Sequence, residues 1–343
     1  MKKHLNTLFV TTEGAYLAKA GDAVAVRIEK KTRLRVPLIN LDGIVCFGRV
    51  ACSPALLAHC AANGVSVTYL SRNGRFLAAV NGFTSGNVLL RREQYRAADD
   101  PERSALIARC CVTGKIANCR TLLRRCARET RDADAVARLN RAADRLSSLL
   151  ALLDEDRELD VVRGFEGEAA TSYFRVFDDL IRTEKDVFTF SGRNRRPPTD
   201  PVNALLSFAY TLLMHDVRSA CESTGLDSAV GFLHRDRPGR PGLALDLMEE
   251  LRPVIADRVV LNLINRRQIK KEDFVFQPNG AVKLTDKGRK TFLYEYQQRR
   301  NEPVVHPFLG EKMTIGFVPL IQARLLARFL RGDLDAYPPF AWK

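Results

Sequence analysis

Residue types that can bind a metal ion or transfer a proton stand out at three places in the C-terminal half of the sequence. Glu166 lies between two glycines at the start of a predicted helix, His234 ends a short apolar run, and Glu249 lies on a further predicted helix. Two carboxylates and one imidazole suit Mg²⁺ or Mn²⁺ better than a thiolate-rich zinc site would. Such an ion can polarise a phosphoryl oxygen and stabilise the attacking or leaving oxygen. Together these residues predict metal-assisted phosphoryl transfer.

The charge balance of the chain favours a polyanionic partner. The 343 residues include 54 Lys and Arg against 40 Asp and Glu, which gives a formal net charge of +14. Arginine is prominent among the cations, and its guanidinium binds phosphate through two parallel hydrogen bonds. The net charge alone is also compatible with a soluble basic protein that binds no polyanion. Acidic residues become useful beside phosphate when they hold a metal ion, so acids and positive charge together indicate a nuclease.

Each candidate ligand also has a purely structural interpretation. Glu166 fits an exposed acid in the first turn of its helix, where the helix dipole favours carboxylates. His234 fits a histidine packed in the core. Asp246 lies three residues before Glu249, so the two share one helix face, and the alternative there is an acidic surface patch paired with Arg252. The three positions favour one shared site only when they are taken together.

Two arginine-rich loops accompany the candidate ligands. Residues 235–242, directly after the histidine, mix arginines with prolines and glycines and so cannot form a helix. A second non-helical cluster occupies residues 191–199. Arginines held in loops can follow a phosphate backbone, although they carry no base code in themselves. The candidate DNA-binding residues are Arg163, Arg193, Arg195, Arg196, Arg235, Arg237 and Arg240.

The motifs that the sequence lacks weigh against several other classes of protein. It has no Gly-x-x-x-x-Gly-Lys phosphate loop, no dinucleotide-binding fingerprint and no nucleophile elbow. The eight cysteines form no Cys-x-x-Cys pair, so we interpret them as reduced thiols in a cytoplasmic protein. There is no signal-peptide pattern and no uncharged run of ~18 apolar residues, so we expect no membrane span.

The predicted elements divide the chain into two parts. The first 80 residues contain short runs with the period of two that is typical of strands, and one helix that begins after Ser53. A segment rich in Gly, Asn and Ser follows at residues 81–87, and the pattern then becomes helical. We therefore expect an α+β fold of two domains, in which the helical one carries the metal site. The expected parts are an N-terminal β-rich domain with one helix (1–80), a linker (81–100) and a C-terminal all-α domain (101–343).

The boundaries of the expected elements follow from helix caps, turn residues and periodicity. Strands are expected at residues 5–12, 15–20, 23–29, 33–36, 65–70 and 75–80, with turns at 21–22 and 71–74. Helices are expected at residues 101–130, 136–153, 160–180, 201–223, 243–266 and 317–331, with a β-hairpin at 274–284. The last residues, which include Tyr337, Phe340 and Trp342, are expected to form a tail packed on the surface.

Four segments of the chain resemble the CRISPR-associated endonuclease and integrase family, the first of the two core spacer-acquisition proteins. Their order, their spacing and the arginines between them all match, and the resemblance covers essentially the whole chain. The matching segments are residues 163–174, 200–210, 231–234 and 243–253. Residues 331–340 resemble the versions of the family that belong to type I-C systems.

The resemblance implies a specific site and a specific assembly. The family's metal ligands fall on Glu166, His234 and Glu249, with Asp246 as a supporting acid, and we expect Glu249 rather than the adjacent Glu250 to be the third ligand. The metal would be Mg²⁺ or Mn²⁺. The resemblance further implies a homodimer that pairs through the N-terminal domain. Two such dimers would flank a dimer of a small companion protein in a heterohexamer that binds double-stranded DNA as prespacer and repeat array.

The expected reaction is the joining of 3′-hydroxyl ends of captured DNA fragments into the repeat array by transesterification. One rival is a metal-dependent nuclease of DNA repair, which would use the same residues to hydrolyse branched DNA. The other rival is a non-catalytic DNA-binding scaffold in which the acids only balance charge. Tyr173 and Tyr210 are possible helpers near the site, and buried helix aromatics are the alternative interpretation of both.

Overall fold

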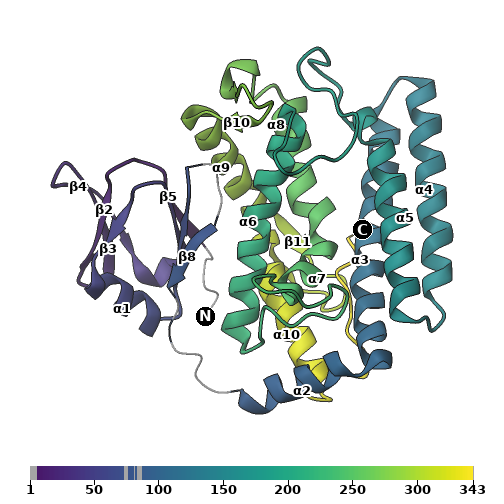
Figure 1. The fold of residues 1–343 in the computed structure, drawn as a ribbon, viewed down its shortest axis with the longest axis horizontal. Helices are drawn as coiled ribbons and strands as arrows, with labels where there is room; N and C mark the ends of the chain where they lie inside the picture. The colour runs from purple at the N-terminus through teal and green to yellow at the C-terminus, as the bar shows by residue number, and fades with distance from the viewer. Residues whose placement is uncertain (1–5, 73–75, 81, 83–86, 343) are drawn as a thin grey trace.

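The computed structural model describes residues 6–72, 76–80, 82 and 87–342, and it contains a β-rich N-terminal region beside a larger helical region (Figure 1). This arrangement confirms the predicted division into a β-rich part with one helix and a helical part. Most of the predicted linker segment at 81–87, half of the predicted turn at 71–74 and the first residue of the predicted strand at 5–12 lie outside the described residues. No helix in the described part of the chain has the length and apolar character needed to cross a membrane.

Two four-stranded sheets build the β-rich region. In the first sheet three strands run parallel and the fourth is antiparallel, in the order β1 (Asn6–Val10), β5 (Leu41–Phe47), β7 (Ser66–Leu70) and β8 (Phe76–Val80). The second has the order β4 (Lys31–Pro37), β3 (Ala23–Ile28), β2 (Tyr16–Ala20) and β6 (Ala51–Cys52). The predicted hairpin between β2 and β3 is confirmed. Helix α1 (Pro54–Ala62) begins as predicted, because the Ser53 hydroxyl accepts a hydrogen bond from the Leu56 amide at 3.2 Å.

The helical region follows the predicted elements in most places. Its helices are α2 (Val88–Asp99), α3 (Pro101–Glu129), α4 (Ala133–Leu153), α5 (Leu159–Arg175), α6 (Pro201–Thr224), α7 (Gly242–Leu251), α8 (Arg258–Asn265), α9 (Asp286–Asn301) and α10 (Val318–Leu330). Its short strands are β9 (Phe274–Phe276), β10 (Val282–Leu284), β11 (Pro303–Val305) and β12 (Lys312–Thr314), and the first two form the predicted hairpin. Helix α2 occupies residues that the sequence assigns to the linker, and α9 is a helix that the sequence analysis does not predict.

The predicted single helix at 243–266 is wrong in its middle. The chain instead forms α7, a π-helical turn at Arg252–Asp257 and then α8. Pro253 lies in this turn and has no amide hydrogen to donate, so an uninterrupted α-helical ladder is not available there. The turn changes the phase of the helix, and it places Arg252 and Asp257 toward neighbouring helices.

Helix α3 is the central support of the helical region, and α4, α5 and α7 all pack against it (Figure 1). It begins at Asp100, whose carboxylate accepts hydrogen bonds from the amides of Glu102 and Arg103. Most of its length is lined by buried apolar residues, and Lys115 is buried among them. A charged side chain in such a place requires compensating partners, which are described below.

The C-terminal tail does not lie on the surface, so that prediction is wrong. Tyr337 and Phe340 are only 1% and 0% exposed, and the tail returns alongside α3 (Figure 1). Asn118 of α3 donates hydrogen bonds to the carbonyls of Phe340 and Glu250, both at 2.7 Å. The tail therefore completes the core between α3 and α7.

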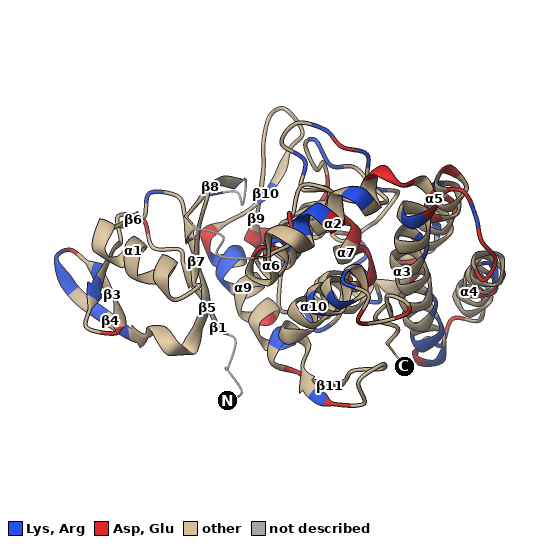
Figure 2. Cartoon of the chain, turned by 90° about the horizontal axis from the view of Figure 1, so that it is seen from below, with Lys and Arg blue, Asp and Glu red and all other residues tan. Residues whose placement is uncertain are grey.

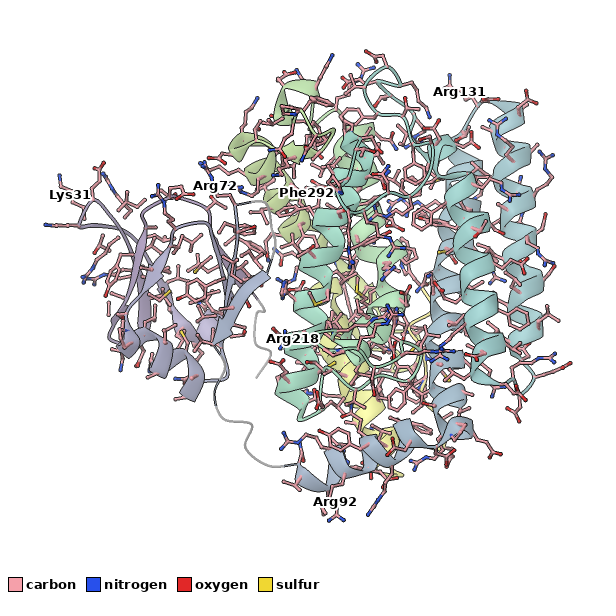
Figure 3. All side chains as sticks on the ribbon, in the orientation of Figure 1. Lys31, Arg72, Arg92, Arg131, Arg218 and Phe292 are labelled. Atoms are coloured by element: carbon pink, nitrogen blue, oxygen red, sulfur yellow. The ribbon has the colours of Figure 1, made fainter. Side chains whose placement is uncertain are left out.

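The two regions also contact one another directly. Arg72, which is labelled in Figure 3, belongs to the β-rich region. It forms an ion pair with Asp286 of α9 at 3.0 Å. Beside it the guanidinium of Arg289 lies over the ring of Phe47, 5.6 Å from its centre. Phe47 in turn packs against Phe208 of α6. Lysines and arginines are found on both regions, including the exposed hairpin between β3 and β4 (Figure 2).

Candidate functional site

One buried ammonium group joins the two glutamates that the sequence singles out. Lys115 on α3 lies 2.7 Å from Oε2 of Glu249 on α7, and it also contacts Oε1 of Glu166 on α5. The lysine side chain is 7% exposed and that of Glu249 is 2% exposed. Three helices therefore bring charged side chains together around a single cation position.

A second cation completes the charge balance at this position. Arg252, in the π-helical turn after α7, lies 3.0 Å from Oε1 of Glu249. Burial acts to raise the pKa of Glu249, but Arg252 and then Lys115 outweigh it and hold that pKa at about 2. Burial likewise acts to lower the pKa of Lys115, while Glu249 and Glu166 bring it above its usual value. Glu249 and Lys115 are therefore both charged at neutral pH.

His234 lies in the loop between α6 and α7, and Asp246 of α7 holds its ring. The ring nitrogen Nδ1 of His234 lies 2.6 Å from Oδ1 of the fully buried Asp246. The same carboxylate accepts hydrogen bonds from the amides of Phe232, Leu233 and His234. A carboxylate at Nδ1 sets the orientation of the ring and leaves Nε2 as the nitrogen for a ligand. Asp246 thus positions the histidine and has no oxygen free to act as a ligand itself.

A glycine makes this close approach possible. A Cβ atom at Gly231 would lie 2.7 Å from Oδ2 of Asp246 and 2.6 Å from the backbone of Gly242. Real side chains do not tolerate such distances, so the loop can fold over the Asp246 carboxylate only with glycine at this point. The residue that precedes the apolar run before His234 is therefore part of the site's architecture.

Arg163 ties the helix of Glu166 to the loop of His234. Its Nε donates to the carbonyl of Leu233 at 2.7 Å, and its Nη1 donates to Asp160 at 2.7 Å. Asp160 also accepts a hydrogen bond from Arg235 at 3.1 Å. These contacts give Arg163 a structural role, and they hold α5 and the loop in register.

The two candidate tyrosines point toward an acid outside the cluster around Lys115. The hydroxyls of Tyr173 and Tyr210 donate to the two oxygens of Asp257, at 2.8 and 2.7 Å. Burial raises the pKa of Asp257 to about 6 even though both hydrogen bonds lower it. This geometry supports their interpretation as buried aromatics. Arg252 lies over the Tyr210 ring, 5.0 Å from its centre, and so links this cluster to Glu249.

The candidate DNA-binding arginines divide into two groups. Arg193 is used internally, because it donates to Asn203 at 2.5 Å and to Ser207 at 3.2 Å and lies 5.3 Å from the centre of the Tyr210 ring. Arg163 lies half-buried on α5, and the remaining candidates lie in exposed or half-buried loop positions. Arg195, Arg196 and Arg237 are exposed, and Arg240 donates weakly to the carbonyl of Arg235 at 3.4 Å.

The donor set fits a cation between Glu166 and Glu249. Oε2 of Glu249 is buried, accepts no hydrogen bond and has only the Lys115 ammonium as its partner among the described residues. His234 is near enough to contribute to the low pKa of Glu249. In the described part of the chain no three His, Cys, Asp or Glu side chains lie in a ready ligand arrangement, so His234 would have to approach the two glutamates to share an ion with them. Glu250 points away from this position and accepts hydrogen bonds from Tyr337, Gln322 and Phe340.

Lys115 is not among the residues that the sequence motifs single out. The only available signal was a single lysine within a long apolar helical stripe, between Gly114 and Ile116. A lysine in such a stripe can also lay its aliphatic stem along the helix and keep its ammonium group in solvent. Its partners lie on α5 and α7, and no local pattern reveals them.

Comparisons with known proteins agree on one family. Residues 8–298 match the family described as CRISPR associated protein Cas1. The chain is 53% identical over 343 residues to the CRISPR-associated endonuclease Cas1 1 of Chlorobaculum tepidum, and all of both chains is covered. It is also 53% identical over 348 residues to the CRISPR-associated endonuclease Cas1 2 of Rhodospirillum rubrum, again with full coverage of both.

A solved structure supports the same conclusion. A Cas1 protein from Thermotoga maritima superposes with a TM-score of 0.81 at 25% identity, covering 97% of this chain and 99% of that one. Sequence and fold therefore agree over nearly the whole length. The chain belongs to the Cas1 family of CRISPR-associated endonucleases, with the divalent metal dependence that this family implies.

Proposed function

We propose that Glu166, His234 and Glu249 hold one divalent ion, Mg²⁺ or Mn²⁺, with which this endonuclease cuts and joins DNA. The observation that carries the proposal is the convergence of both glutamates on one cation position, with Nε2 of His234 directed by the Asp246 contact at Nδ1. Oxygen donors with a single nitrogen match the preferences of these two ions. Mg²⁺ and Mn²⁺ can both stabilise the charge that develops during phosphodiester cleavage.

Each residue of the site has a separate task in this reaction. When bound, the ion supplies charge stabilisation at the phosphoryl oxygens and lowers the pKa of an attacking water or hydroxyl. Asp246 keeps the His234 ring in one orientation and tautomer. Arg252 keeps Glu249 ionised. No side chain forms a covalent intermediate, because positioning and charge stabilisation are sufficient for such a displacement.

The substrate is double-stranded DNA, held in part by the arginine loops. Arg195, Arg196 and Arg237 are exposed and have no ion pair in the described part of the structure, so they are available to phosphates. Four further arginines contribute to DNA binding indirectly, because they stabilise these loops: Arg163, Arg193, Arg235 and Arg240. The reaction is the joining of the 3′-hydroxyl of a captured fragment to the repeat array, in the manner of the type I-C version of the family.

The assembly follows from the same family resemblance. The chain pairs as a homodimer through its β-rich domain at residues 1–80, with residues 81–100 as the connection to the catalytic part at 101–343. Two dimers and a dimer of a small companion protein form a heterohexamer. A reducing, cytoplasmic setting is supported by the eight cysteines, all of which are free thiols.

The site is tested by a pair of alanine variants on one helix. Glu166→Ala should reduce metal-dependent DNA cleavage at least ~100-fold, because even the outer partners of a metal site are worth about 10–100-fold. Glu168→Ala is the matched control, since Glu168 lies two residues away and pairs with Arg145 at 2.6 Å outside the site. His234→Ala and Glu249→Ala should behave like Glu166→Ala. Equal loss in the Glu168 variant, or full activity in the other three, would remove the assignment.

Joining is distinguished from simple hydrolysis by the products. A labelled fragment with a free 3′-hydroxyl is incubated with a supercoiled plasmid carrying a repeat array, the companion protein and Mn²⁺. Covalent transfer of the label to the plasmid supports the proposed reaction. Nicked plasmid without any label, under conditions in which the protein is active on branched DNA, would support a repair nuclease in its place.

A further inference from the structure

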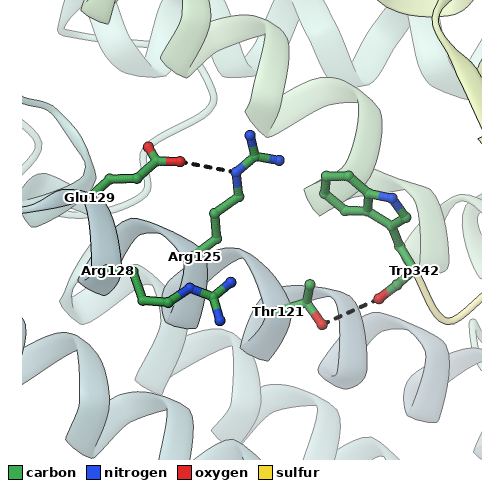
Figure 4. Close-up of a pocket in the computed structure, with 5 residues that line it drawn as sticks. All are labelled: Thr121, Arg125, Arg128, Glu129 and Trp342. Atoms are coloured by element: carbon green, nitrogen blue, oxygen red, sulfur yellow. Dashed lines mark hydrogen bonds and ion pairs between the residues drawn. The ribbon is translucent and has the colours of Figure 1, made fainter.

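A pocket with an unusual combination of side chains lies at the C-terminal end of α3, where the tail of the chain ends. It has a volume of about 280 Å³, and Figure 4 shows the residues that line it. These are Thr121, Arg125, Arg128, Glu129 and Trp342. The volume is at the small end of ligand sites, which suits one small group rather than a large molecule. The residues of this pocket have no part in the metal site proposed above.

The backbone of Trp342 anchors the residue at the pocket. Its amide donates to Oδ1 of Asn118 at 2.6 Å, and its carbonyl accepts from the Thr121 hydroxyl at 3.3 Å (Figure 4). The indole is half-buried and is the only tryptophan side chain in the sequence. A large aromatic surface, packed in part against the core, is thus fixed at the wall of a pocket.

The indole is also made rigid by a neighbouring arginine. The guanidinium of Arg299 lies 5.4 Å from the centre of the Trp342 ring. Arg299 is itself fixed by two hydrogen bonds to the carbonyl of Val254, at 2.9 and 2.7 Å. A cation placed over one face of an indole stabilises its orientation. The ring is therefore positioned before any ligand arrives.

The pocket has more cations than acids around it. Arg125 pairs with Glu129 at 3.0 Å, whereas the exposed Arg128 has no ion pair in the described part of the chain. Nearby, Nε of Arg258 is buried without a hydrogen-bond partner. Burial is the main reason that the pKa of Arg258 is lowered, and repulsion from the positive charge of Arg125 is the second. A bound anion would relieve this repulsion.

We propose that this pocket binds one unpaired nucleotide of a DNA strand, with its phosphate on Arg125 and Arg128 and its base against the indole of Trp342. Aromatic side chains accept any base by stacking, and arginines hold the backbone beside them. The base must be unpaired, because both faces of a base inside a duplex are already covered. The proposal rests on the proposed function, since it gives a DNA-processing enzyme a second place to hold its substrate.

The location suits a strand that also reaches the metal site. Arg125 follows Lys115 by ten residues on α3, and a rise of 1.5 Å per residue separates them by roughly 15 Å. That length corresponds to about four phosphates along one strand of a duplex. A strand with an unpaired end or flank can therefore engage both places at once.

The single tryptophan provides a direct test. The full-length protein in EDTA is titrated with an oligothymidylate of about 12 nucleotides, a length within the usual site size of single-strand binders. A blunt duplex of the same length serves as the comparison. We expect saturable quenching of Trp342 fluorescence by the single strand and little change with the duplex. Binding detected by anisotropy of a labelled strand without any change in Trp342 fluorescence would overturn the proposal.

Matched variants separate the pocket from general charge. Arg128→Gln should weaken single-strand binding severalfold and reduce the salt slope of log K by about 0.7, the value of one single-strand phosphate. Arg141→Gln removes an exposed arginine on α4 that has no ion pair in the described structure, and it should change neither quantity. Trp342→Ala should weaken binding at least about fivefold and Trp342→Phe much less. Equal effects of the two arginine variants would overturn the proposal.

The outcome does not depend on whether the metal site is assigned correctly. Glu166→Ala should abolish metal-dependent cleavage and leave the Trp342 quenching unchanged. A wild-type protein that cleaves DNA without quenching rejects the pocket alone. Quenching that persists while Glu166→Ala retains full cleavage rejects the catalytic assignment and supports the pocket.

Discussion

Lys115 and Glu249 form a buried ion pair, 2.7 Å from Nζ to Oε2, between two helices that are distant in the sequence. The same ammonium contacts Glu166, so one lysine neutralises two carboxylates that would otherwise repel each other. A cation that enters between these glutamates must displace the ammonium or share the carboxylates with it. The lysine therefore acts as a positioning residue for the proposed metal site.

Lys115→Met should strengthen metal binding and weaken the fold in the absence of metal. Removal of the ammonium takes away a like charge that opposes the incoming ion, and an interaction of this kind is worth about tenfold or more in affinity. It also leaves the buried Glu249 beside the half-buried Glu166 with only Arg252 to balance their charge, and breaking a buried ion pair costs about 3–5 kcal/mol. Calorimetric titration with Mn²⁺ gives the first effect, and thermal unfolding in EDTA and in Mn²⁺ gives the second.

The control for that experiment is Lys185→Met. Lys185 pairs with Asp178 at 2.6 Å in an exposed position, so the same chemical change there should alter neither Mn²⁺ affinity nor the response of stability to metal. A Lys115→Met protein whose Mn²⁺ affinity matched the wild type would show that the lysine and the ion do not share a position.

Asp246→Asn should lower the affinity for the metal about 10–100-fold. An amide in place of the carboxylate cannot accept all four hydrogen bonds that reach Asp246, and it removes the charge that fixes His234. Asp144→Asn is the matched control, because Asp144 is an exposed acid on α4 that pairs with Arg124 away from the site. Mn²⁺ titration of both variants decides the matter, and unchanged affinity in Asp246→Asn contradicts the positioning role.

Glu250 should make the protein less stable as the pH rises from about 4.5 to about 7. Burial raises the pKa of Glu250 to about 7 despite hydrogen bonds from Tyr337, Phe340 and Gln322. A raised pKa means that the folded state keeps a proton that the unfolded state loses, so stability is full below the unfolded pKa and declines up to the folded one. The loss amounts to on the order of 3 kcal/mol at 1.36 kcal/mol per unit.

Glu250→Gln should flatten that part of the pH profile. The amide carbonyl can still accept from Phe340 and Gln322, and the amide nitrogen can donate to the Tyr337 oxygen. Urea unfolding of both proteins between pH 4.5 and 8 measures the difference. A variant with the same slope as the wild type would assign the pH dependence to another group, such as Asp257.

Asn118→Ala should destabilise the protein by about 3 kcal/mol or more. The side chain of Asn118 donates hydrogen bonds to the carbonyls of Glu250 and Phe340 and accepts one from the amide of Trp342. Each of these groups that is left unpaired costs about 1–3 kcal/mol. Asn140→Ala is the control, since Asn140 accepts one hydrogen bond from Arg124 beside a surface ion pair. Urea unfolding at one pH compares them, and equal losses would mean that the tail is not a stabilising element.

The local elements of the fold were largely predictable from sequence. Ser53, Asp100 and Asp200 each cap a helix through their own side chain, and the caps lie next to the residues that they satisfy. The hairpins at 21–22 and 274–284 depend on turn residues within a few positions. The π-helical turn was missed, because Pro253 permits several continuations and packing selects one.

The residue types of the candidate site can be read from the sequence, and their geometry cannot. The sequence by itself identified Glu166, His234 and Glu249 as acids and an imidazole in contexts that suit a metal, because side-chain chemistry is a local property. Only the tertiary structure placed Lys115 between the two glutamates, turned Glu250 toward the buried tail and engaged Arg193 internally. These outcomes depend on which helices pack together. A buried charge needs a partner, and here the partners of Lys115 are distant in sequence.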